Sequence, residues 1–302
     1  MEERCGYVAI IGRPNVGKST LLNYLLGQKL SITSRKPQTT RHRLLGIKTI
    51  GNTQIIYVDT PGLHQHQHNA MNRYLNQAAT RSISGVNVIV WLIEAGRWTL
   101  DDDYVLSTYV QSKINNPKSK VPVILGVNKV DKISNKATLL PYLQEMALKH
   151  KFVEVIPISA RQGNNLVELE EKVISLLPQS IKLFPEDQFT DRSERFLCAE
   201  IIREKLIRRL GAELPYKITV QIEYFESKKN LTKISALIWV ERQGQKIIVI
   251  GKKGQGLKAT GEAARKEMEE MLSCKVFLQL WVKIKQGWCD DERTLQQLGY
   301  FE

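Results

Sequence analysis

The chain has 302 residues, of which 42% are hydrophobic and 25% charged, a composition that excludes an intrinsically disordered protein. Its length predicts two domains, since single domains usually hold about 100–200 residues. Lys and Arg total 44 against 31 Asp and Glu, and the formal net charge of +13 favours a polyanionic partner, either nucleic acid or anionic lipid.

The start of the chain and its cysteines bear on where the protein works. The first residues lead directly into a strand-like run without a basic segment followed by an apolar one, which argues against a secretory signal. No apolar run in the sequence approaches the roughly 20 residues that span a bilayer. The cysteines lack CxxC spacing, which favours reduced thiols over a zinc site or disulfides. These features predict a cytoplasmic protein.

Strand-like and helix-like segments alternate from residue 7 to residue 177. Several of the strand-like runs are almost entirely apolar, as is typical of parallel strands buried on both faces. The alternation predicts a doubly wound α/β domain over residues 1–177, in which ligands bind at the carboxyl ends of the strands. The predicted strands are Tyr7–Gly12, Leu44–Ile50, Gln54–Asp59, Val86–Ile93, Val121–Val127 and Glu154–Ile158.

Residues 178–191 lack a clear period and are predicted to form a linker. A smaller α+β domain is expected over residues 192–285, followed by a tail at 286–302. Its predicted elements are a helix at 192–210, strands at 216–225 and 231–241, an apolar segment at 246–250, a helix at 255–272 and a strand at 276–284. The alternation in the first of these strands predicts that Tyr224 shares the buried side with Ile222.

A glycine-rich loop follows the first predicted strand and opens a helix. It matches G-x-x-x-x-G-K-S, in which backbone N–H groups surround the phosphates of a nucleoside triphosphate and the helix N-terminus faces them. Lys18 is expected to reach the β- and γ-phosphates, and the Ser19 hydroxyl to bind Mg²⁺. The nucleotide-binding residues predicted here are Gly12, Arg13, Pro14, Asn15, Val16, Gly17, Lys18, Ser19 and Thr20.

Three further motifs follow strands of the same predicted sheet. Asp59-Thr60-Pro61-Gly62 supplies a carboxylate that can hold Mg²⁺ through water and a glycine N–H that can approach a γ-phosphate. Asn128-Lys129-Val130-Asp131 selects guanine, because Asp131 can accept hydrogen bonds from N1–H and from the 2-amino group that adenine lacks. Ser159-Ala160 offers backbone amides to guanine O6. Together with the glycine-rich loop, these motifs and Leu63, which follows Gly62, predict a GTP site.

These motifs, in this order, resemble the translation-factor-related GTPases, and within them the Era family. The resemblance to Era rests on Gly12–Ser19, on Gln38-Thr39-Thr40-Arg41-His42 and on the second domain, and it covers nearly the whole chain. It implies that Ser31–Arg43 is switch I and that Thr40 completes the Mg²⁺ shell, with Thr39 as the alternative. It also implies that Lys18, Thr40 and Gly62 serve hydrolysis.

The residue after the D-x-x-G motif is Leu63, where many GTPases carry a Gln that orients the attacking water. Leu63 cannot hydrogen-bond water, so slow intrinsic hydrolysis is predicted unless the switch I backbone or a partner assists. Asn15 matches the Asn that holds K⁺ in potassium-activated relatives, which makes K⁺ a second expected cofactor. His64, His66 and His68 alternate with Gln nearby, and a solvated switch II loop is preferred there over a metal site.

A second glycine motif, Gly251-Lys252-Lys253-Gly254, precedes the helix predicted at 255–272. The motif and the order of elements around it resemble a type II KH domain, in which G-x-x-G lets a nucleic-acid backbone approach while an apolar groove accepts about four unpaired bases. Lys258 is expected to contact RNA as well. Residues 227–285 contain 13 Lys and Arg against five Asp and Glu, which agrees with RNA binding.

The last predicted strand carries basic and aromatic residues on its second face: Lys275, Phe277, Gln279, Trp281, Lys283 and Lys285. Aromatic and basic side chains interleaved in this way are able to stack on bases and meet phosphates. Packing of Phe277 and Trp281 against the linker or a helix is an equally good interpretation of the sequence.

The resemblance implies a monomeric GTPase that binds the 3′ end of small-subunit (16S) rRNA and assists rRNA processing and 30S subunit assembly. GTP would order Gln38–Arg43 and Gly62–His68 and thereby change how these loops pack against the second domain. The alternative is a regulatory GTPase whose basic domain binds anionic lipid, and the family's peripheral association with the inner face of the cell membrane is compatible with both. A nucleotide-inactive RNA-binding module is disfavoured, because Lys18, Ser19, Asp59 and Asp131 are all present.

Overall fold

The structure is a computed structural model that describes residues 2–34, 36, 39–63, 70–110, 121–211, 214–298 and 300. The chain divides into two compact units, with the change near Asp191 and Arg192. The described part of 32–39 and of 68–74 belongs to the second unit. Both segments were predicted to belong to the first domain, but their contacts with the helix Glu194–Arg209 and with the C-terminal tail group them with the second.

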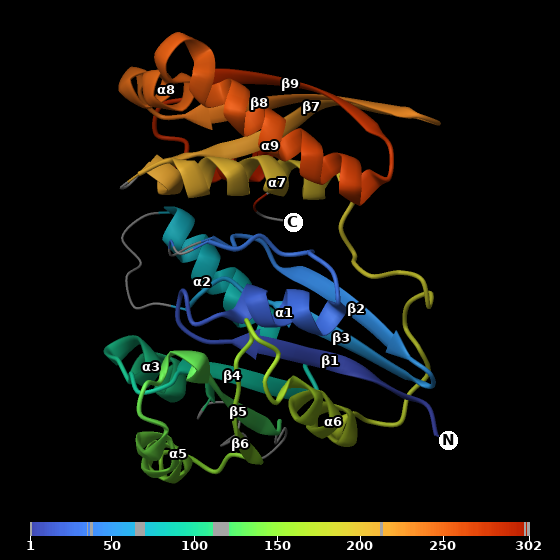
Figure 1. The fold of residues 1–302 in the computed structure, drawn as a ribbon, viewed down its shortest axis with the longest axis vertical. Helices are drawn as coiled ribbons and strands as arrows, with labels where there is room; N and C mark the ends of the chain where they lie inside the picture. The colour runs from blue at the N-terminus through green and yellow to red at the C-terminus, as the bar shows by residue number, and fades with distance from the viewer. Residues whose placement is uncertain are drawn as a thin grey trace. The chain divides into compact units, whose positions relative to one another are not determined.

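A six-stranded sheet in the order β2-β3-β1-β4-β5-β6 forms the centre of the first unit (Figure 1). Its strands pair in parallel except β2, which runs antiparallel to β3 because the two residues between them allow only a hairpin. The predicted doubly wound α/β fold is confirmed, with strand ends shifted by a few residues. The strands are β1 (Arg4–Ile11), β2 (Leu44–Ile50), β3 (Thr53–Asp59), β4 (Val88–Glu94), β5 (Val123–Asn128) and β6 (Glu154–Pro157).

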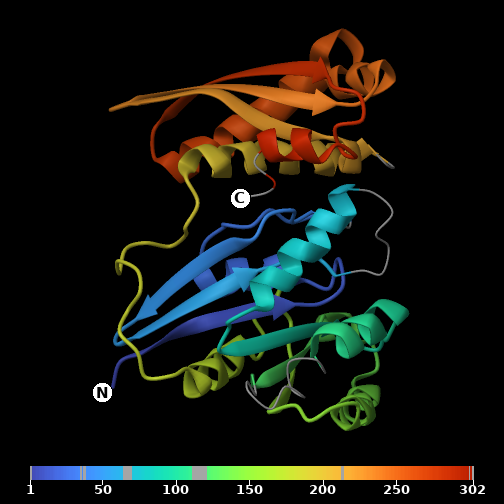
Figure 2. The ribbon, with the colours of Figure 1, turned by 180° about the vertical axis from the view of Figure 1, so that it is seen from behind.

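Helices cover both faces of this sheet: α1 and α6 lie on one face, and α2 and α3 lie on the other (Figures 1 and 2). A hydrophobic core lies on the second of these faces, where Trp91 and Ile89 pack with Ala79 of α2 and Val105 of α3. The helices are α1 (Lys18–Leu26), α2 (Ala70–Ile83), α3 (Leu100–Val105), α5 (Leu139–Leu148) and α6 (Leu166–Leu176), with short helical turns η1 (Leu106–Val110), η2 (Val130–Lys132) and η3 (Lys136–Thr138).

The second unit is built on a three-stranded sheet with α7 and α9 on one face (Figures 1 and 2). Helix α7 begins where the Ser193 hydroxyl accepts a hydrogen bond from the Phe196 N–H, which caps the helix. The elements are α7 (Glu194–Arg209), η4 (Leu214–Lys217), β7 (Thr219–Lys228), β8 (Leu231–Val240), α8 (Gln243–Ile250), η5 (Lys252–Gly254), α9 (Gln255–Leu272), β9 (Lys275–Ile284) and α10 (Glu292–Gln297). This order matches the predicted α+β domain.

The prediction for Tyr224 is wrong. The pairing of β7 with β8 shifts register between Ile222 and Tyr224, where a β-bulge adds one residue to β7. An extra residue reverses the alternation beyond it. Tyr224 therefore lies opposite Ser235 and is 48% exposed, while Ile222 stays in the core.

No helix within the described ranges combines the length and the hydrophobicity that a bilayer span requires.

Candidate functional site

The glycine-rich loop connects β1 to α1, and two of its glycines have conformations that other residues rarely adopt. Gly12 has φ 145° and Gly17 has φ 111°. A Cβ atom on Gly12 would lie 2.5 Å from the Leu92 carbonyl oxygen, and one on Gly17 would lie 2.3 Å from the Asn128 side-chain amide. Both positions therefore require glycine, and the loop backbone can curve around an anion.

Lys18 is the first residue of α1 and its side chain folds back over the loop. Its Nζ donates to the carbonyl oxygens of Gly12 and Arg13 at 3.0 and 3.1 Å. Burial lowers the pKa of Lys18 to about 8, with Arg13 adding to the shift and Asp59 opposing it. A phosphate group here would meet an ammonium group that is already desolvated.

Four side-chain oxygens, from Ser19, Ser31, Thr40 and Asp59, converge next to Lys18. The Ser19 hydroxyl lies 2.8 Å from the Thr40 hydroxyl and donates to Asp59 Oδ2 at 3.0 Å. Ser31 also donates to Asp59 Oδ2, at 2.7 Å. Burial raises the pKa of the Asp59 carboxyl, although these hydroxyl groups lower it.

This donor set fits a small divalent cation. Asp59 is fully buried, and its Oδ1 has no hydrogen-bond partner in the part of the chain that the structure describes. Hydroxyl and carboxylate oxygens are the ligands that Mg²⁺ prefers. The Thr39 hydroxyl lies elsewhere, 2.6 Å from the Ser34 hydroxyl. Groups of three or more His, Cys, Asp or Glu arranged for a metal do not occur within the described ranges.

The D-x-x-G segment runs beside the glycine-rich loop. A Cβ atom on Gly62 would lie 2.8–2.9 Å from atoms of Pro14, so glycine is needed for this close approach. Thr60 donates to the Ile10 carbonyl oxygen at 2.9 Å, which holds the segment to β1. Leu63 is fully buried in the core with Ala79 and Trp91, so its side chain faces away from the nucleotide site.

Asn128, at the end of β5, connects three of the predicted motifs. Its Nδ2 donates to the Val16 carbonyl oxygen at 2.8 Å, and its Oδ1 accepts from the backbone N–H groups of Lys129 and Ala160 at 2.7 and 2.9 Å. Asp131 Oδ1 accepts from the Ser159 hydroxyl at 2.6 Å. These bonds place the carboxylate of Asp131 and the Ser159-Ala160 turn together, as a guanine site requires.

A carboxylate that the sequence analysis did not single out joins the phosphate and base regions. Glu94 ends β4, and its Oε2 lies 3.0 Å from Arg13 Nη2 and 3.1 Å from Lys129 Nζ. Burial raises the pKa of Glu94, but Lys129 and Arg13 outweigh it and hold the pKa below its ordinary value. The sequence offered one signal for Glu94, its position directly after the predicted strand Val86–Ile93.

Asp102 completes this ion-pair network from the other side of Arg13. It is fully buried, and its Oδ2 accepts from Arg13 Nε at 3.1 Å and from the Thr99 hydroxyl at 2.8 Å. Thr99 and Asp102 form the capping box of α3. The T-x-x-D spacing was visible in the sequence, but its link to Arg13 was not.

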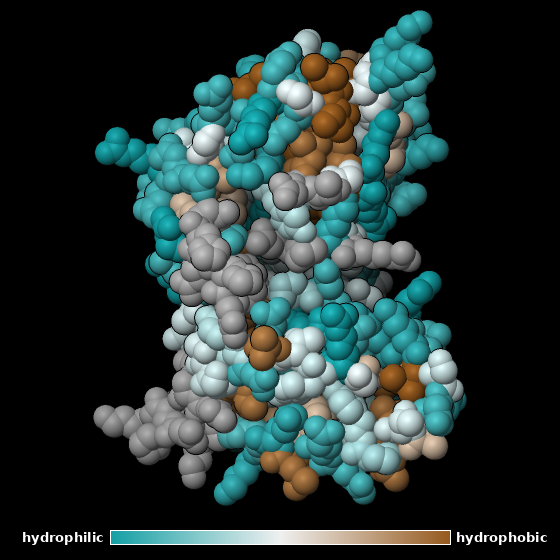
Figure 3. Space-filling model, turned by 90° about the vertical axis from the view of Figure 1, so that its left-hand side faces the viewer, coloured by the Kyte–Doolittle hydropathy of each residue, from teal (hydrophilic) through white to brown (hydrophobic). Residues whose placement is uncertain are grey.

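The G-x-x-G motif of the second unit forms the turn between α8 and α9. Gly251 has φ 73° and Gly254 has φ 77°, and Lys253 between them also has a positive φ of 50°. Lys252 and Lys253 are exposed at this turn. Exposed hydrophobic residues of α8, Ile247 and Ile248, lie close to it in the sequence. Figure 3 shows hydrophobic residues gathered on this side of the unit.

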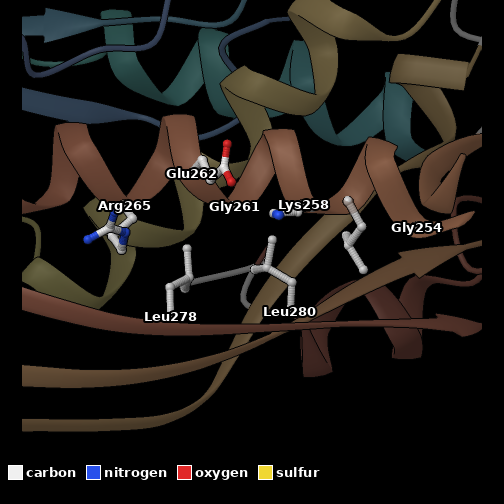
Figure 4. Close-up of a pocket in the computed structure, with 8 residues that line it drawn as sticks. Gly254, Lys258, Gly261, Glu262, Arg265, Leu278 and Leu280 are labelled. Atoms are coloured by element: carbon white, nitrogen blue, oxygen red, sulfur yellow. The ribbon is translucent and has the colours of Figure 1, made fainter.

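An open groove of about 410 Å³ runs between α9 and β9 (Figure 4). Its floor is apolar, because Leu278 and Leu280 of β9 point toward α9. Polar side chains of α9 line the rim, and Lys258 is one of them. The lining residues are Gly254, Leu257, Lys258, Gly261, Glu262, Arg265, Leu278 and Leu280. The shape and lining suit unpaired bases beside a G-x-x-G turn.

Within the second unit, Thr33 and Thr39 form hydrogen bonds with α7 that no pattern in the sequence predicted. Glu204 is fully buried and its Oε1 accepts from the Thr33 N–H at 2.9 Å. Arg203 Nη2 donates to the Thr39 carbonyl oxygen at 2.5 Å. The segment thus ends next to Thr40, whose hydroxyl faces Ser19.

Two predicted features lie outside the described residues: Gln38 of the proposed switch I motif, and the histidines His64, His66 and His68.

Comparisons with known proteins agree with this organisation. A family model described as a 50S ribosome-binding GTPase matches residues 7–129, and a KH domain model matches residues 213–289. The chain is 56% identical over 299 residues to the GTPase Era of Ectopseudomonas mendocina (strain ymp), covering 99% of this chain and 98% of that protein. It is 55% identical to the GTPase Era of Pseudomonas aeruginosa (strain LESB58), covering 98% and 95%.

Two solved structures are similar over almost the whole length, each with a TM-score of 0.93 and 40% identity. One is Era in complex with MgGDPNP and nucleotides 1506–1542 of 16S ribosomal RNA, covering 99% of both chains. The other is a variant of Aquifex aeolicus Era bound to GDP·AlF4⁻, covering 98% of this chain and 99% of that one.

Proposed function

Since the chain belongs to the Era family of GTPases, we propose that it binds the 3′ end of 16S rRNA through its KH domain and assists rRNA processing and 30S subunit assembly. The observation that carries this proposal is the groove between α9 and β9 beside the G-x-x-G turn. A similar Era structure holds nucleotides 1506–1542 of that RNA. Lys252, Lys253 and Lys258 supply cations for its phosphates.

The nucleotide is GTP, and the chain's own residues bind and orient it. Lys18 and the loop amides hold the β- and γ-phosphates, and the Gly62 N–H approaches the γ-phosphate. Asp131 accepts from the guanine N1–H and 2-amino group, in a position supported by Ser159 and Asn128.

Ser19, Thr40 and Asp59 are the residues that would hold Mg²⁺, and Mg²⁺ neutralises charge on the β- and γ-phosphate oxygens when it is bound. Their oxygens already lie within 2.8–3.5 Å of each other. Thr40 is preferred over Thr39, because the Thr39 hydroxyl is directed to Ser34 and to the Lys36 carbonyl oxygen.

Intrinsic hydrolysis is slow, because the buried Leu63 offers no hydrogen bond to the attacking water. K⁺ at Asn15 would add positive charge beside the phosphates. The Asn15 side chain is exposed in the glycine-rich loop, where its backbone has φ 61°. Equal turnover in K⁺ and in Na⁺ would refute it.

The nucleotide state is coupled to RNA binding through the segment at 32–39. Thr40 belongs to the proposed Mg²⁺ site, while the carbonyl oxygen of its neighbour Thr39 accepts from Arg203 of α7. A change at the γ-phosphate that moves Thr40 therefore also shifts Thr39 and its hydrogen bond to α7. Helix α7 packs against α9 in the core of the KH domain.

Filter binding of the 3′-terminal segment of 16S rRNA tests the proposal. The chain is titrated with a GTP analogue and with GDP, at two salt concentrations, against a scrambled RNA and beside a Gly251→Asp/Lys252→Asp variant. Tight binding that depends on sequence, is favoured by the GTP analogue and is lost in the variant supports it. Weak binding that ignores sequence and disappears with salt reports counterion release alone and contradicts it. Binding to anionic vesicles without RNA selectivity would favour the lipid-binding alternative.

A further inference from the structure

The outer face of the KH sheet exposes three aromatic side chains that neither the GTP site nor the groove uses. Phe277 and Trp281 of β9 are 52% and 58% exposed, and Tyr224 of β7 is 48% exposed. The sequence left open whether Phe277 and Trp281 pack against another element; in the part of the chain that the structure describes, both remain exposed. Large exposed apolar groups gathered on one face mark binding sites.

Strand pairing places these residues on one surface. Phe277 and Trp281 of β9 pair with Lys233 and Leu237 of β8. Tyr224 of β7 pairs with Ser235 of β8, which in turn pairs with Gln279 of β9. Residues paired in this way point to the same side of a sheet. Phe277 and Trp281 are four residues apart, or about 13 Å, and Tyr224 lies about 10 Å across the sheet. The three rings share this face, and the side chains of Ser235 and Gln279, which hydrogen-bond to each other at 3.3 Å, lie between them. The three rings are called the platform.

The platform carries more positive than negative charge. Lys233, Lys275 and Lys283 share this face with the aromatic rings, and the acidic side chains of β7 are Glu223 and Glu226, of which Glu226 lies opposite Lys233. Lys283 Nζ lies 3.7 Å from Glu223, a loose pair between two half-exposed groups that contributes little. Aromatic rings among lysines are typical of surfaces that stack successive bases and hold the phosphates between them.

The platform is continuous with the groove, because β9 contributes to both. β9 is the last strand of the sheet order β7-β8-β9. Leu278 and Leu280 point toward α9 and form the floor of the groove (Figure 4), while Phe277 and Trp281 point to the opposite face. Only the width of one edge strand separates the two surfaces.

We propose that the aromatic platform, formed by Tyr224, Phe277 and Trp281 with Lys233, Lys275 and Lys283, is a second binding site for single-stranded RNA. It stacks the nucleotides that leave the groove over the edge of β9. This inference rests on the proposed function, since the groove must hold RNA for the platform to extend it. It gives the protein a longer RNA footprint than the roughly four nucleotides of a KH groove.

The test compares two RNAs on the full chain with a GTP analogue: one of about five nucleotides, which fills the groove, and one of about 15 nucleotides with the same core, extended at both ends. We expect wild type to bind the longer RNA more tightly. Phe277→Ala and Trp281→Ala should each weaken the longer RNA about 5- to 100-fold, the loss of one stacked base, and leave the shorter RNA within twofold. Trp281→Phe should retain most of the affinity.

Matched controls separate the platform from the groove and from the fold. Ile247→Ala, at an exposed position of α8, should affect both RNAs alike or neither. Thermal unfolding should be unchanged in the platform variants, because these side chains are exposed. Equal affinity of wild type for the two RNAs, or equal loss for both in Trp281→Ala, overturns the inference while leaving the groove proposal intact. Absence of binding to either RNA refutes the proposed function and this inference together.

A further arm distinguishes RNA from lipid. Vesicles of anionic phosphatidylglycerol are pelleted with wild type and with the Phe277→Ala/Trp281→Ala variant. If the variant loses vesicle binding but keeps wild-type affinity for the longer RNA, the platform binds a lipid surface and the inference is wrong.

Discussion

Replacing Glu94 by Gln should weaken GDP and GTP binding without changing the chemical step. Glu94 Oε2 lies about 3 Å from both Arg13 Nη2 and Lys129 Nζ, and the three side chains are 17%, 9% and 20% exposed. Gln has the same shape and keeps an acceptor oxygen, but it removes the charge that pairs with Lys129 of the N-K-x-D motif and with Arg13 of the glycine-rich loop.

The magnitude follows from this partial burial. Exposed ion pairs contribute about 0.2–1 kcal/mol, whereas breaking a buried pair costs about 3–5 kcal/mol. Arg13 retains Asp102 at 3.1 Å, so only part of its pairing is lost. We expect nucleotide binding to weaken by about 1–2 kcal/mol, a factor of about 5–30. The turnover number should stay within about twofold, because Glu94 pairs with Arg13 and Lys129 rather than with Lys18, Thr40 or Gly62, the residues proposed to serve hydrolysis.

Isothermal titration with GDP and single-turnover hydrolysis of GTP measure the two quantities, and urea unfolding measures stability. Asp102→Asn is the matched control, since it disturbs Arg13 but leaves Lys129 paired with Glu94. This control should lower the free energy of unfolding. It should weaken nucleotide binding less than Glu94→Gln does. The reasoning fails if Glu94→Gln lowers stability but leaves nucleotide affinity unchanged, because Glu94 would then act only on the fold.

Three further predictions concern the same site. Asp131→Asn should weaken GTP about 10⁴-fold and favour xanthine nucleotides, whose 2-oxo group can accept from the new amide; competition against a labelled GDP measures this, and a loss under tenfold contradicts it. The pKa of Lys18 is lowered to about 8, so its ammonium group loses a proton as the pH rises through 8. The Kd for GTP should therefore be flat below pH 8 and rise roughly tenfold per pH unit above it. If wild type and Lys18→Arg both show a flat profile, titration of Lys18 does not control GTP binding. Leu63→Gln should not accelerate hydrolysis, since the side chain is in the core, and it should destabilise the fold by about 2–4 kcal/mol in urea unfolding; faster turnover with unchanged stability would show that residue 63 faces the nucleotide.

The nucleotide site was largely predictable because its parts are local. A loop that surrounds phosphates needs glycines, a lysine and a serine close together after a strand, and these lie between Gly12 and Ser19. Each remaining motif follows a strand of the same sheet. Parallel strands bring their carboxyl ends to one edge, so the predicted doubly wound sheet already placed Asp59, Asn128 and Ser159 along the same edge.

The partners of these residues were not predictable, because they depend on contacts between distant positions. Glu94 and Asp102 flank Arg13 from 81 and 89 residues away. Glu204 binds the Thr33 N–H from 171 residues away. Pairings of this kind leave no periodic signal, since one charged residue at the end of an element looks like any other until the fold brings its partner near.

The outer face of the KH sheet shows the same division along a single strand. The alternation of β9 alone determined that Phe277 and Trp281 share a face and that Leu278 and Leu280 share the other, because successive side chains of a strand point to opposite sides. Which face is covered depends on where α9 packs, and which face Tyr224 joins depends on one extra residue in β7. Only the tertiary structure decides these points, because helix packing and strand register arise between elements rather than within them.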